Sequence, residues 1–298
     1  MRKVDFNSSG IKVVGNMFFP DDFDEKRQYP ALIFTHPAGG VKEQTSGIYA
    51  EKFAKYGYIT LAYDASYQGE SEGIPIGFEN PSSRVGDIHS AVDYFTTVPY
   101  IDKNKIGGVG ICAGGGYMIK AAQTDHRIKA IVGVSPLDMG LVFREGLNGN
   151  DPDAVFGILD QVATARTAEA NGAAPIIGKW TPDECDPNTS EEMKNCHDFY
   201  KNRAKHPRST GEYPFINFDR VVEFSSFDEG LAKLFRQPAI IFIGDRAGTA
   251  WLAKRAYDLM HVDKKELVII KDADHFDLYD HKSDEVVEKA VSFLKEVL

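Results

Sequence analysis

Cys112 stands in a segment whose residue types suit covalent chemistry. The segment 110–114 reads Gly-Ile-Cys-Ala-Gly, which is the G-x-S-x-G spacing of a nucleophile elbow with a thiol in place of the hydroxyl. Glycines on both sides permit the close backbone approach of a sharp strand-to-helix turn. A helix that begins directly after the cysteine, together with a nearby imidazole, can lower the pKa of such a thiol. We therefore expect Cys112 to be an activated nucleophile; the alternative is a small buried residue in a glycine-rich turn.

His275 is the residue that we expect to act as the base. It lies between the last predicted strand and the last predicted helix, where triads in the chain order nucleophile, acid, histidine hold their imidazole. There it can take the thiol proton and later activate water or an acceptor alcohol. The alternative is a histidine that only caps this loop. Among the other histidines, His36 ends a predicted strand beside the elbow, and we expect it to contact the pocket.

Alternating strands and helices must position these residues. Short apolar runs predict buried strands, and apolar stripes at helical spacing predict amphipathic helices between them. The pattern favours an α/β fold with a mostly parallel central sheet and helices on both faces. In such sheets ligands bind at the carboxyl ends of the strands. The predicted strands are an opening hairpin within 4–19, followed by 31–35, 58–63, 106–111, 128–135, 239–244 and 267–270.

The alternation stops between residues 137 and 236. This interval lacks further buried strand patterns but carries helix signals, such as an apolar stripe after Asp151-Pro152 and a capping box at Thr189 and Glu192. We predict a helical cap over 137–236, inserted between two parts of one core at 1–136 and 237–298. The spacing of Cys196 within the second helix favours a core position over a ligand role.

Composition narrows the function classes. The chain has 298 residues, 43% hydrophobic and 26% charged, with a net charge of −10, so we expect neither nucleic acid nor a membrane as a partner. The N-terminal segment has no apolar core of a signal peptide. Three unevenly spaced cysteines predict no disulfide framework and no metal site. We expect a cytoplasmic protein that acts on a small acyl substrate without a cofactor, with a homodimer as one option.

Four segments together resemble a known superfamily. They are 36–40 (His-Pro-Ala-Gly-Gly), 64–71 (Asp-Ala-Ser-Tyr-Gln-Gly-Glu-Ser), 110–116 (Gly-Ile-Cys-Ala-Gly-Gly-Gly) and 274–280 (Asp-His-Phe-Asp-Leu-Tyr-Asp). The chain resembles the α/β-hydrolase superfamily, and more closely its Cys-nucleophile, dienelactone-hydrolase-like branch, which is related to polyketide acyl transferases. The resemblance covers nearly the whole predicted sheet domain and implies acyl chemistry by a Cys–His–acid triad. It names no substrate.

The acid is where the sequence departs from that family. The usual carboxylate would stand three residues after the strand that ends at Gly244, and that position is Ala247. Asp245 is one candidate for the acid, and Asp138, which follows the preceding strand, is the other. For the oxyanion hole we expect the N–H of Ala113 and one N–H from the loop 36–40, where Pro37 has none and Ala38 is the first candidate.

These expectations define the predicted function. It is a hydrolase that cleaves an ester, lactone or thioester through an acyl-enzyme on Cys112. One alternative is an acyltransferase that passes the acyl group to an alcohol or amine. The other is a hydrolase fold without catalysis that serves as a binding protein, which the missing acid at Ala247 would favour.

Overall fold

The computed structural model describes residues 1–298 apart from the side chain of Ala154. Its centre is an eight-stranded sheet in the order β1-β2-β4-β3-β5-β6-β9-β10. β1 and β2 form the predicted antiparallel hairpin, β2 pairs antiparallel with β4, and all other neighbours are parallel. The strands are β1 (Arg2–Ser8), β2 (Ile11–Phe18), β3 (Tyr29–Thr35), β4 (Ile59–Tyr63), β5 (Ile101–Ile111), β6 (Ile128–Val134), β9 (Ala239–Gly244) and β10 (Lys265–Ile270).

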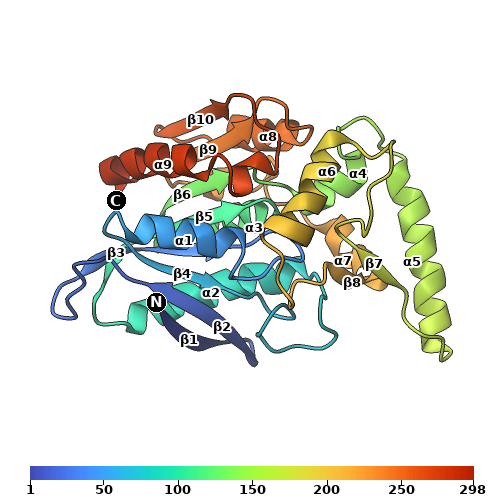
Figure 1. Ribbon diagram of the computed structural model, residues 1–298, viewed down its shortest axis with the longest axis horizontal. Coiled ribbons are helices and arrows are strands. Elements are labelled where there is room, and N and C mark those ends of the chain that lie inside the picture. Colours follow the sequence, from blue (N-terminus) through green and yellow to red (C-terminus); the bar gives the residue numbers. More distant parts are fainter.

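Helices cover both faces of this sheet. The strand order runs one way from β3 to β4 and the opposite way from β5 to β6, and right-handed crossovers therefore place the connecting helices on opposite faces. α1 and α9 contact each other in front of the sheet in Figure 1, and α2 contacts α3. The helices of the core are α1 (Thr45–Ala54), α2 (Pro81–Thr97), α3 (Ala113–Ala122), α8 (Ala250–Leu259) and α9 (Ser283–Val297).

The hydrophobic core explains why these segments fold as they do. β3, β4, β6 and β9 are buried almost throughout, as the continuous apolar runs predict for strands covered on both faces. α2 begins at Pro81 because the side chain of Asn80 caps it by accepting from the N–H groups of Ser82 and Ser83. The predicted fold class is confirmed.

Residues 137–236 form the segment between β6 and β9, which we call the inserted segment. It lies at the right of the sheet in Figure 1, beyond the carboxyl ends of the parallel strands. It is mostly helical, as predicted, but it also contains a short antiparallel pair that the sequence did not reveal. Its elements are α4 (Met139–Glu145), α5 (Ala154–Ala170), β7 (Ile177–Lys179), α6 (Glu191–Asp198), β8 (Glu212–Pro214) and α7 (Phe218–Glu223).

The start of α6 differs by one residue from the predicted capping box. Ser190 is the N-cap and accepts from the N–H of Met193, whereas Thr189 belongs to the preceding turn, where its N–H donates to Asp186. Glu192 is therefore the second residue of α6 and does not bond back to the N-cap. Its carboxyl group instead accepts from the N–H of Gly248. Cys196 is buried on this helix, as predicted.

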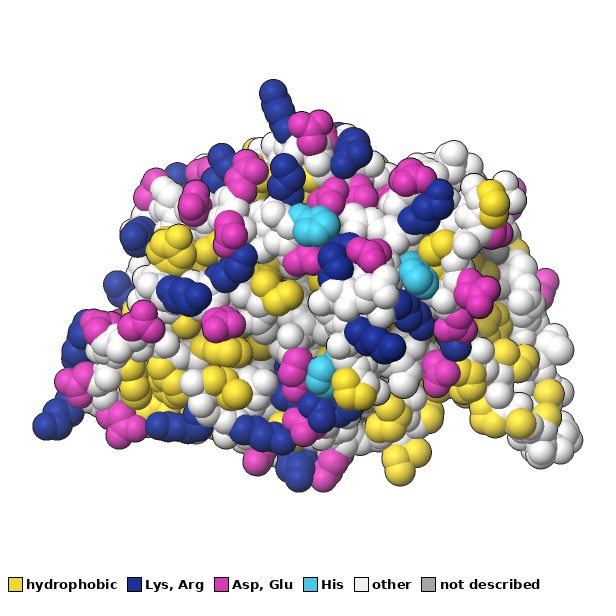
Figure 2. Space-filling model, in the orientation of Figure 1, with side chains coloured by type: hydrophobic (Ala, Val, Ile, Leu, Met, Phe, Trp, Pro, Cys, Tyr) yellow, Lys and Arg dark blue, Asp and Glu magenta, His cyan; other side chains and the backbone are white. Residues whose placement is uncertain are grey.

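The visible surface is of mixed charge. Figure 2 shows Lys and Arg side chains interspersed with Asp and Glu over this face, while hydrophobic side chains gather at the lower right, over the inserted segment. Phe156, Ile176 and Ile177 are among the exposed apolar residues of that segment. Among the described residues, no helix combines the length and the apolar character needed to cross a bilayer.

Candidate active site

Cys112 lies at the tip of a sharp turn between β5 and α3. Its φ of 56° places a non-glycine residue in the left-handed region, which is the strain expected of an elbow. The flanking glycines are required by space: a Cβ on Gly114 would contact the carbonyl oxygen of Thr35, and one on Gly110 would lie 2.5 Å from the Cα of Gly115. The predicted strand, turn and helix are therefore confirmed, with the cysteine at the position that projects from the sheet.

The environment of the thiol differs from the expectation. Cys112 is only 8% exposed, and burial raises the pKa of its thiol to about 11 rather than lowering it. The hydroxyl of Tyr279 and the N–H groups of Ala113 and Ala38 oppose this rise because they favour the thiolate. Ala113 and Ala38 are the two residues predicted to form the oxyanion hole, and both N–H groups lie at the sulfur. The resting thiol is thus protonated but surrounded by donors.

His275 follows β10 and is buried, with 2% of its surface exposed. Its Nδ1 lies 2.8 Å from Oγ1 of Thr249, and its Nε2 lies 3.2 Å from the hydroxyl oxygen of Tyr279. Burial lowers the pKa of this imidazole to about 3, so the ring is neutral at physiological pH. A neutral ring that carries its proton on Nδ1 can accept a proton at Nε2, which is what a general base requires.

Neither predicted acid contacts this histidine, so the structure corrects that part of the site. Asp138 caps α4 through the N–H of Leu141, and its other oxygen accepts from the N–H and the hydroxyl of Ser226. Asp245 is exposed and accepts from the N–H of Ala273, a contact that lowers the pKa of its carboxyl. Both carboxylates have structural partners instead of the imidazole.

Thr249 and Tyr279 are the site residues that sequence reasoning missed. Thr249 is buried directly before α8, where its hydroxyl takes the place expected for a carboxylate. Tyr279 is four residues after His275, and the short helix at 277–279 turns its hydroxyl back towards the imidazole and the thiol. Tyr279 could have been predicted from its spacing of four residues from His275, which brings two side chains together on one helical turn. Thr249 has no such pattern in the sequence around it.

His36 is not a pocket residue. It is buried, its Nδ1 lies 2.7 Å from the carbonyl oxygen of Pro37, and its Nε2 accepts from the N–H of Ala65. With both ring nitrogens satisfied by backbone, His36 holds the loop that carries Ala38 against the end of β4. The expected contact of His36 with the pocket is therefore corrected to a structural role.

Asp64 has a structural role in the turn that follows β4. It accepts from the N–H groups of Lys42 and Glu70 and forms an ion pair at 2.7 Å with the Lys42 ammonium, whose side chain is 1% exposed. The buried lysine was not expected from the sequence. Its charge is balanced by Asp64, Glu70 and Glu43, which satisfies the requirement that a buried charge be paired.

Cys112 and His275 open onto one cavity of about 170 Å³ between the sheet and the inserted segment. This volume is below the roughly 300–1,000 Å³ of usual ligand pockets, which favours a small ligand. The lining is mainly apolar, and Glu192 contributes its one carboxyl group among the described residues. The residues that line the cavity are Pro37, Ala38, Cys112, Leu137, Met139, Val142, Phe143, Leu147, Trp180, Thr181, Glu192, Met193, Cys196, Tyr200, Thr249, His275, Phe276 and Tyr279.

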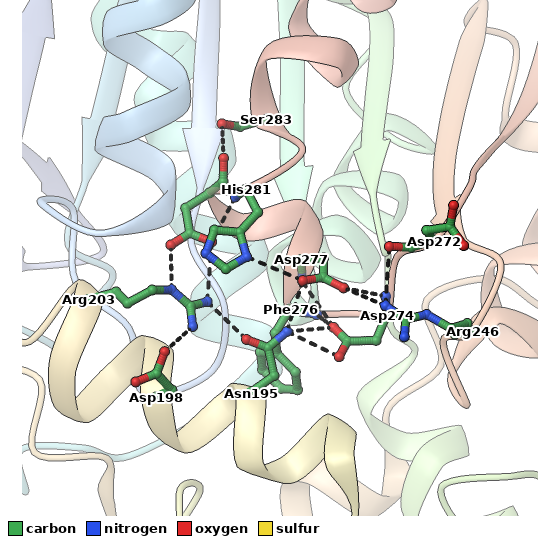
Figure 3. A network of polar contacts seen from close by, with 11 residues as sticks. Asn195, Asp198, Arg203, Arg246, Asp272, Asp274, Phe276, Asp277, His281 and Ser283 are labelled. Carbon is green, nitrogen blue, oxygen red and sulfur yellow. Dashed lines mark hydrogen bonds and ion pairs between the residues drawn. The ribbon is translucent and has the colours of Figure 1, made fainter.

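A polar network ties α6 to the loop that carries His275 (Figure 3). The side-chain amide of Asn195 donates to Asp274 at 2.9 Å and to Asp277 at 3.2 Å. Arg203 donates to Asp280 at 2.8 Å and to the amide oxygen of Asn195 at 3.0 Å. These contacts flank His275 on both sides in the sequence, so they fix the position of the inserted segment relative to the imidazole.

Comparison with known proteins identifies the family. A model of the dienelactone hydrolase family matches residues 19–152, which include the elbow and end before His275. An uncharacterized protein of Escherichia coli, YcjY, is 38% identical over 298 residues, which is 98% of this chain and 96% of that protein. The chain belongs to the dienelactone-hydrolase-like branch of the α/β-hydrolases. It is thus a hydrolase of the α/β-hydrolase type.

One solved structure shares the fold of this chain over its full length. The crystal structure of the hypothetical protein PA2218 from Pseudomonas aeruginosa superposes with a TM-score of 0.91 at 29% identity, covering all of this chain and 93% of that one. A thiohydrolase of Aspergillus aculeatus, aneE, is 32% identical over 171 residues, covering 56% of this chain and 51% of that protein.

Proposed function

We propose that this α/β-hydrolase cleaves a small ester, lactone or thioester through an acyl-enzyme on Cys112. The observation that carries the proposal is the convergence of four groups on one apolar cavity. They are the strained thiol of Cys112, the N–H groups of Ala38 and Ala113, and the neutral imidazole of His275. The relationship to a protein named a thiohydrolase supports the thioester as one member of the substrate class.

The first chemical step is acylation. The sulfur of Cys112 attacks the acyl carbon, a carbon–sulfur bond forms, and the carbonyl oxygen becomes an oxyanion beside the N–H groups of Ala113 and Ala38. The thiol proton passes to the hydroxyl oxygen of Tyr279 while the Tyr279 proton passes to Nε2 of His275. The imidazolium then protonates the leaving alcohol or thiol, and the bond from carbon to the leaving group breaks.

The second step is deacylation. His275 takes a proton from water, the hydroxide attacks the thioester, and the bond between carbon and the sulfur of Cys112 breaks. The imidazolium of His275 returns its proton to the sulfur by way of the Tyr279 hydroxyl, so the products are the carboxylic acid and the regenerated thiol. Thr249 orients the ring throughout, because its hydroxyl accepts from Nδ1–H and so keeps Nε2 available.

The pKa values indicate the protonation states in which the site rests. With a thiol pKa of about 11 and an imidazole pKa of about 3, a resting thiolate–imidazolium pair is unfavourable. The site therefore rests with both groups neutral and moves the proton only as the carbon–sulfur bond forms. The donors at the sulfur and the hydroxyl partners of the imidazole support this order of events.

Intact-protein mass spectrometry tests the proposal. Exposure to a panel of activated esters and thioesters, including p-nitrophenyl butanoate and the N-acetylcysteamine thioester of butanoate, should add one acyl mass to the protein. The adduct should be absent in Cys112→Ala and retained in Cys185→Ala and Cys196→Ala. An adduct that survives Cys112→Ala contradicts the assignment of the nucleophile, and the absence of any adduct favours a binding protein.

The fate of the adduct separates water from other acceptors. In a hydrolase the acyl-enzyme decays within seconds in buffer alone, since usual turnover rates are roughly 1–1000 per second. A thioester that persists for minutes and disappears only after an alcohol or amine is added would assign the protein to acyl transfer instead.

A further inference from the structure

Glu192 occupies an unusual place for a carboxylate. It lies on α6, one helical turn before Asn195, whose contacts to Asp274 and Asp277 hold this helix against the His275 loop (Figure 3). Its Oε2 accepts from the N–H of Gly248 at 3.3 Å. The backbone N–H of His275 also faces this carboxyl group. Glu192 is thus fixed at the His275 side of the cavity.

The second oxygen of this carboxyl group makes no hydrogen bond among the described residues. Oε1 of Glu192 is buried and finds no hydrogen-bond partner among the described residues, although the side chain lines the cavity. A buried acceptor without a partner costs free energy that a ligand can recover by supplying a donor. Burial also raises the pKa of this carboxyl group.

A second unpartnered group lies in the same lining. The indole N–H of Trp180 is buried and has no acceptor among the described residues. The remaining lining is dominated by apolar side chains such as Leu137, Val142 and Phe143. Two residues of the mainly apolar lining, Glu192 and Trp180, thus each carry a buried polar atom that has no hydrogen-bond partner among the described residues.

We propose that Glu192 is a specificity-determining residue that accepts a hydrogen bond from a hydroxyl group of the substrate. Hydroxylated acyl donors would then be the preferred substrates of the reaction at Cys112, and the inference rests on that proposed function. A hydroxyl fits better than an ammonium, because apolar walls make the desolvation of a full charge costly, whereas one acceptor satisfies one hydroxyl proton.

The experiment compares matched acyl donors in pairs. The rate constants of Cys112 acylation are measured by mass spectrometry for the N-acetylcysteamine thioesters of butanoate, 3-hydroxybutanoate, 4-hydroxybutanoate and 4-aminobutanoate. We expect at least one hydroxyacyl donor to exceed butanoate by about tenfold or more, which is the effect of one hydrogen bond to a charged acceptor.

Variants assign that preference to Glu192. In Glu192→Leu, which keeps bulk but removes the acceptor, the ratio of hydroxyacyl to butanoyl rates should fall to near one. Glu192→Gln should give an intermediate ratio, because an amide oxygen still accepts. Glu191→Gln is the matched control, because Glu191 is the preceding residue, points to solvent and pairs only with Lys194; its ratio should equal that of the wild type.

The outcomes separate this inference from the proposed function. Acylation by butanoate with no preference for any hydroxyacyl donor, or a preference that Glu192→Leu retains, overturns the role of Glu192 while Cys112 stays the nucleophile. A preference for the 4-aminobutanoyl donor overturns the hydroxyl class. If no donor acylates the protein, the proposed function and the inference both fail.

Discussion

The nucleophile side of the cavity is held by backbone, whereas the histidine side is held by hydroxyl groups. The turn that carries Cys112 requires glycines, because a Cβ at those positions would clash with neighbouring backbone atoms. The donors at the sulfur are the backbone N–H groups of Ala38 and Ala113. His275 instead depends on the side chains of Thr249 and Tyr279. The turn at Cys112 therefore tolerates few other residues at its glycine positions. At His275, in contrast, a hydroxyl takes the place of a carboxylate as the partner of Nδ1.

This difference has a chemical consequence. A carboxylate beside the imidazole would stabilise the imidazolium and raise the pKa of His275. Thr249 cannot do so, and the pKa stays at about 3. The two sides of the cavity are therefore matched, because a thiol that resists ionisation faces an imidazole that resists protonation. Under the proposed function, the bound substrate triggers the proton transfer.

The largest effect is expected when the histidine side loses its imidazole. His275→Ala should lower kcat by about three orders of magnitude or more and leave KM within a few-fold, because the base acts in the transition state. Steady-state kinetics with the donor that acylates the wild type would measure this. His261→Gln is the control, since that histidine is exposed; equal losses in both variants would contradict the role of His275.

A smaller loss is expected when the group between the two sides is removed. Tyr279→Phe keeps the ring contacts with His275 and Phe199 but deletes the hydroxyl that links the thiol to Nε2. We expect kcat to fall by about 10–100-fold, the lower part of the range for positioned proton transfer. Single-turnover acylation should show the same loss. An unchanged acylation rate would mean that the proton passes from Cys112 to His275 without Tyr279.

The smallest effects are expected at Thr249, the observed partner of His275, and at Asp245, the predicted one. Thr249→Val should lower kcat by about tenfold because Nδ1 loses its acceptor, and Thr249→Ser should restore most of it. Asp245→Asn should change kcat by less than about threefold, since Asn can still accept from Ala273. A loss near 10⁴-fold in Asp245→Asn, the cost of losing an essential triad acid, would show that Asp245 reaches the imidazole during turnover.

Sequence alone predicted the sheet, the elbow and the placement of His275, because each rests on a strong local pattern. Continuous apolar runs mark strands buried on both faces, and glycines around Cys112 mark a turn that tolerates no Cβ. The partners of His275 were not predictable in the same way. Asp245 and Thr249 each lie two residues from the family position at Ala247, yet the loop turns Asp245 towards Ala273 and solvent.

Two further properties of the site, the pKa of Cys112 and the position of Glu192, depend on packing between segments that are distant in the sequence. Burial raises the pKa of Cys112 and outweighs the donors at the sulfur, which are the Tyr279 hydroxyl and the N–H groups of Ala113 and Ala38. Likewise, Glu192 lies in the cavity lining on a helix that Ser190 caps and that Asn195 fixes to the His275 loop. Neither property could be predicted from the residues that neighbour Cys112 or Glu192 in the sequence.

The central claim is that thiol and imidazole are both neutral at rest, and the pH dependence of Cys112 alkylation tests it most directly. Iodoacetamide reacts with the thiolate, so its rate at a thiol with a pKa of about 11 should rise about tenfold per pH unit from pH ~6 to ~9. Mass spectrometry follows the Cys112 adduct, with Cys112→Ala to subtract reaction at Cys185 and Cys196. The account predicts a continuous rise across this range. A plateau reached with a midpoint below pH ~7 would reveal a resting thiolate–imidazolium pair and contradict it.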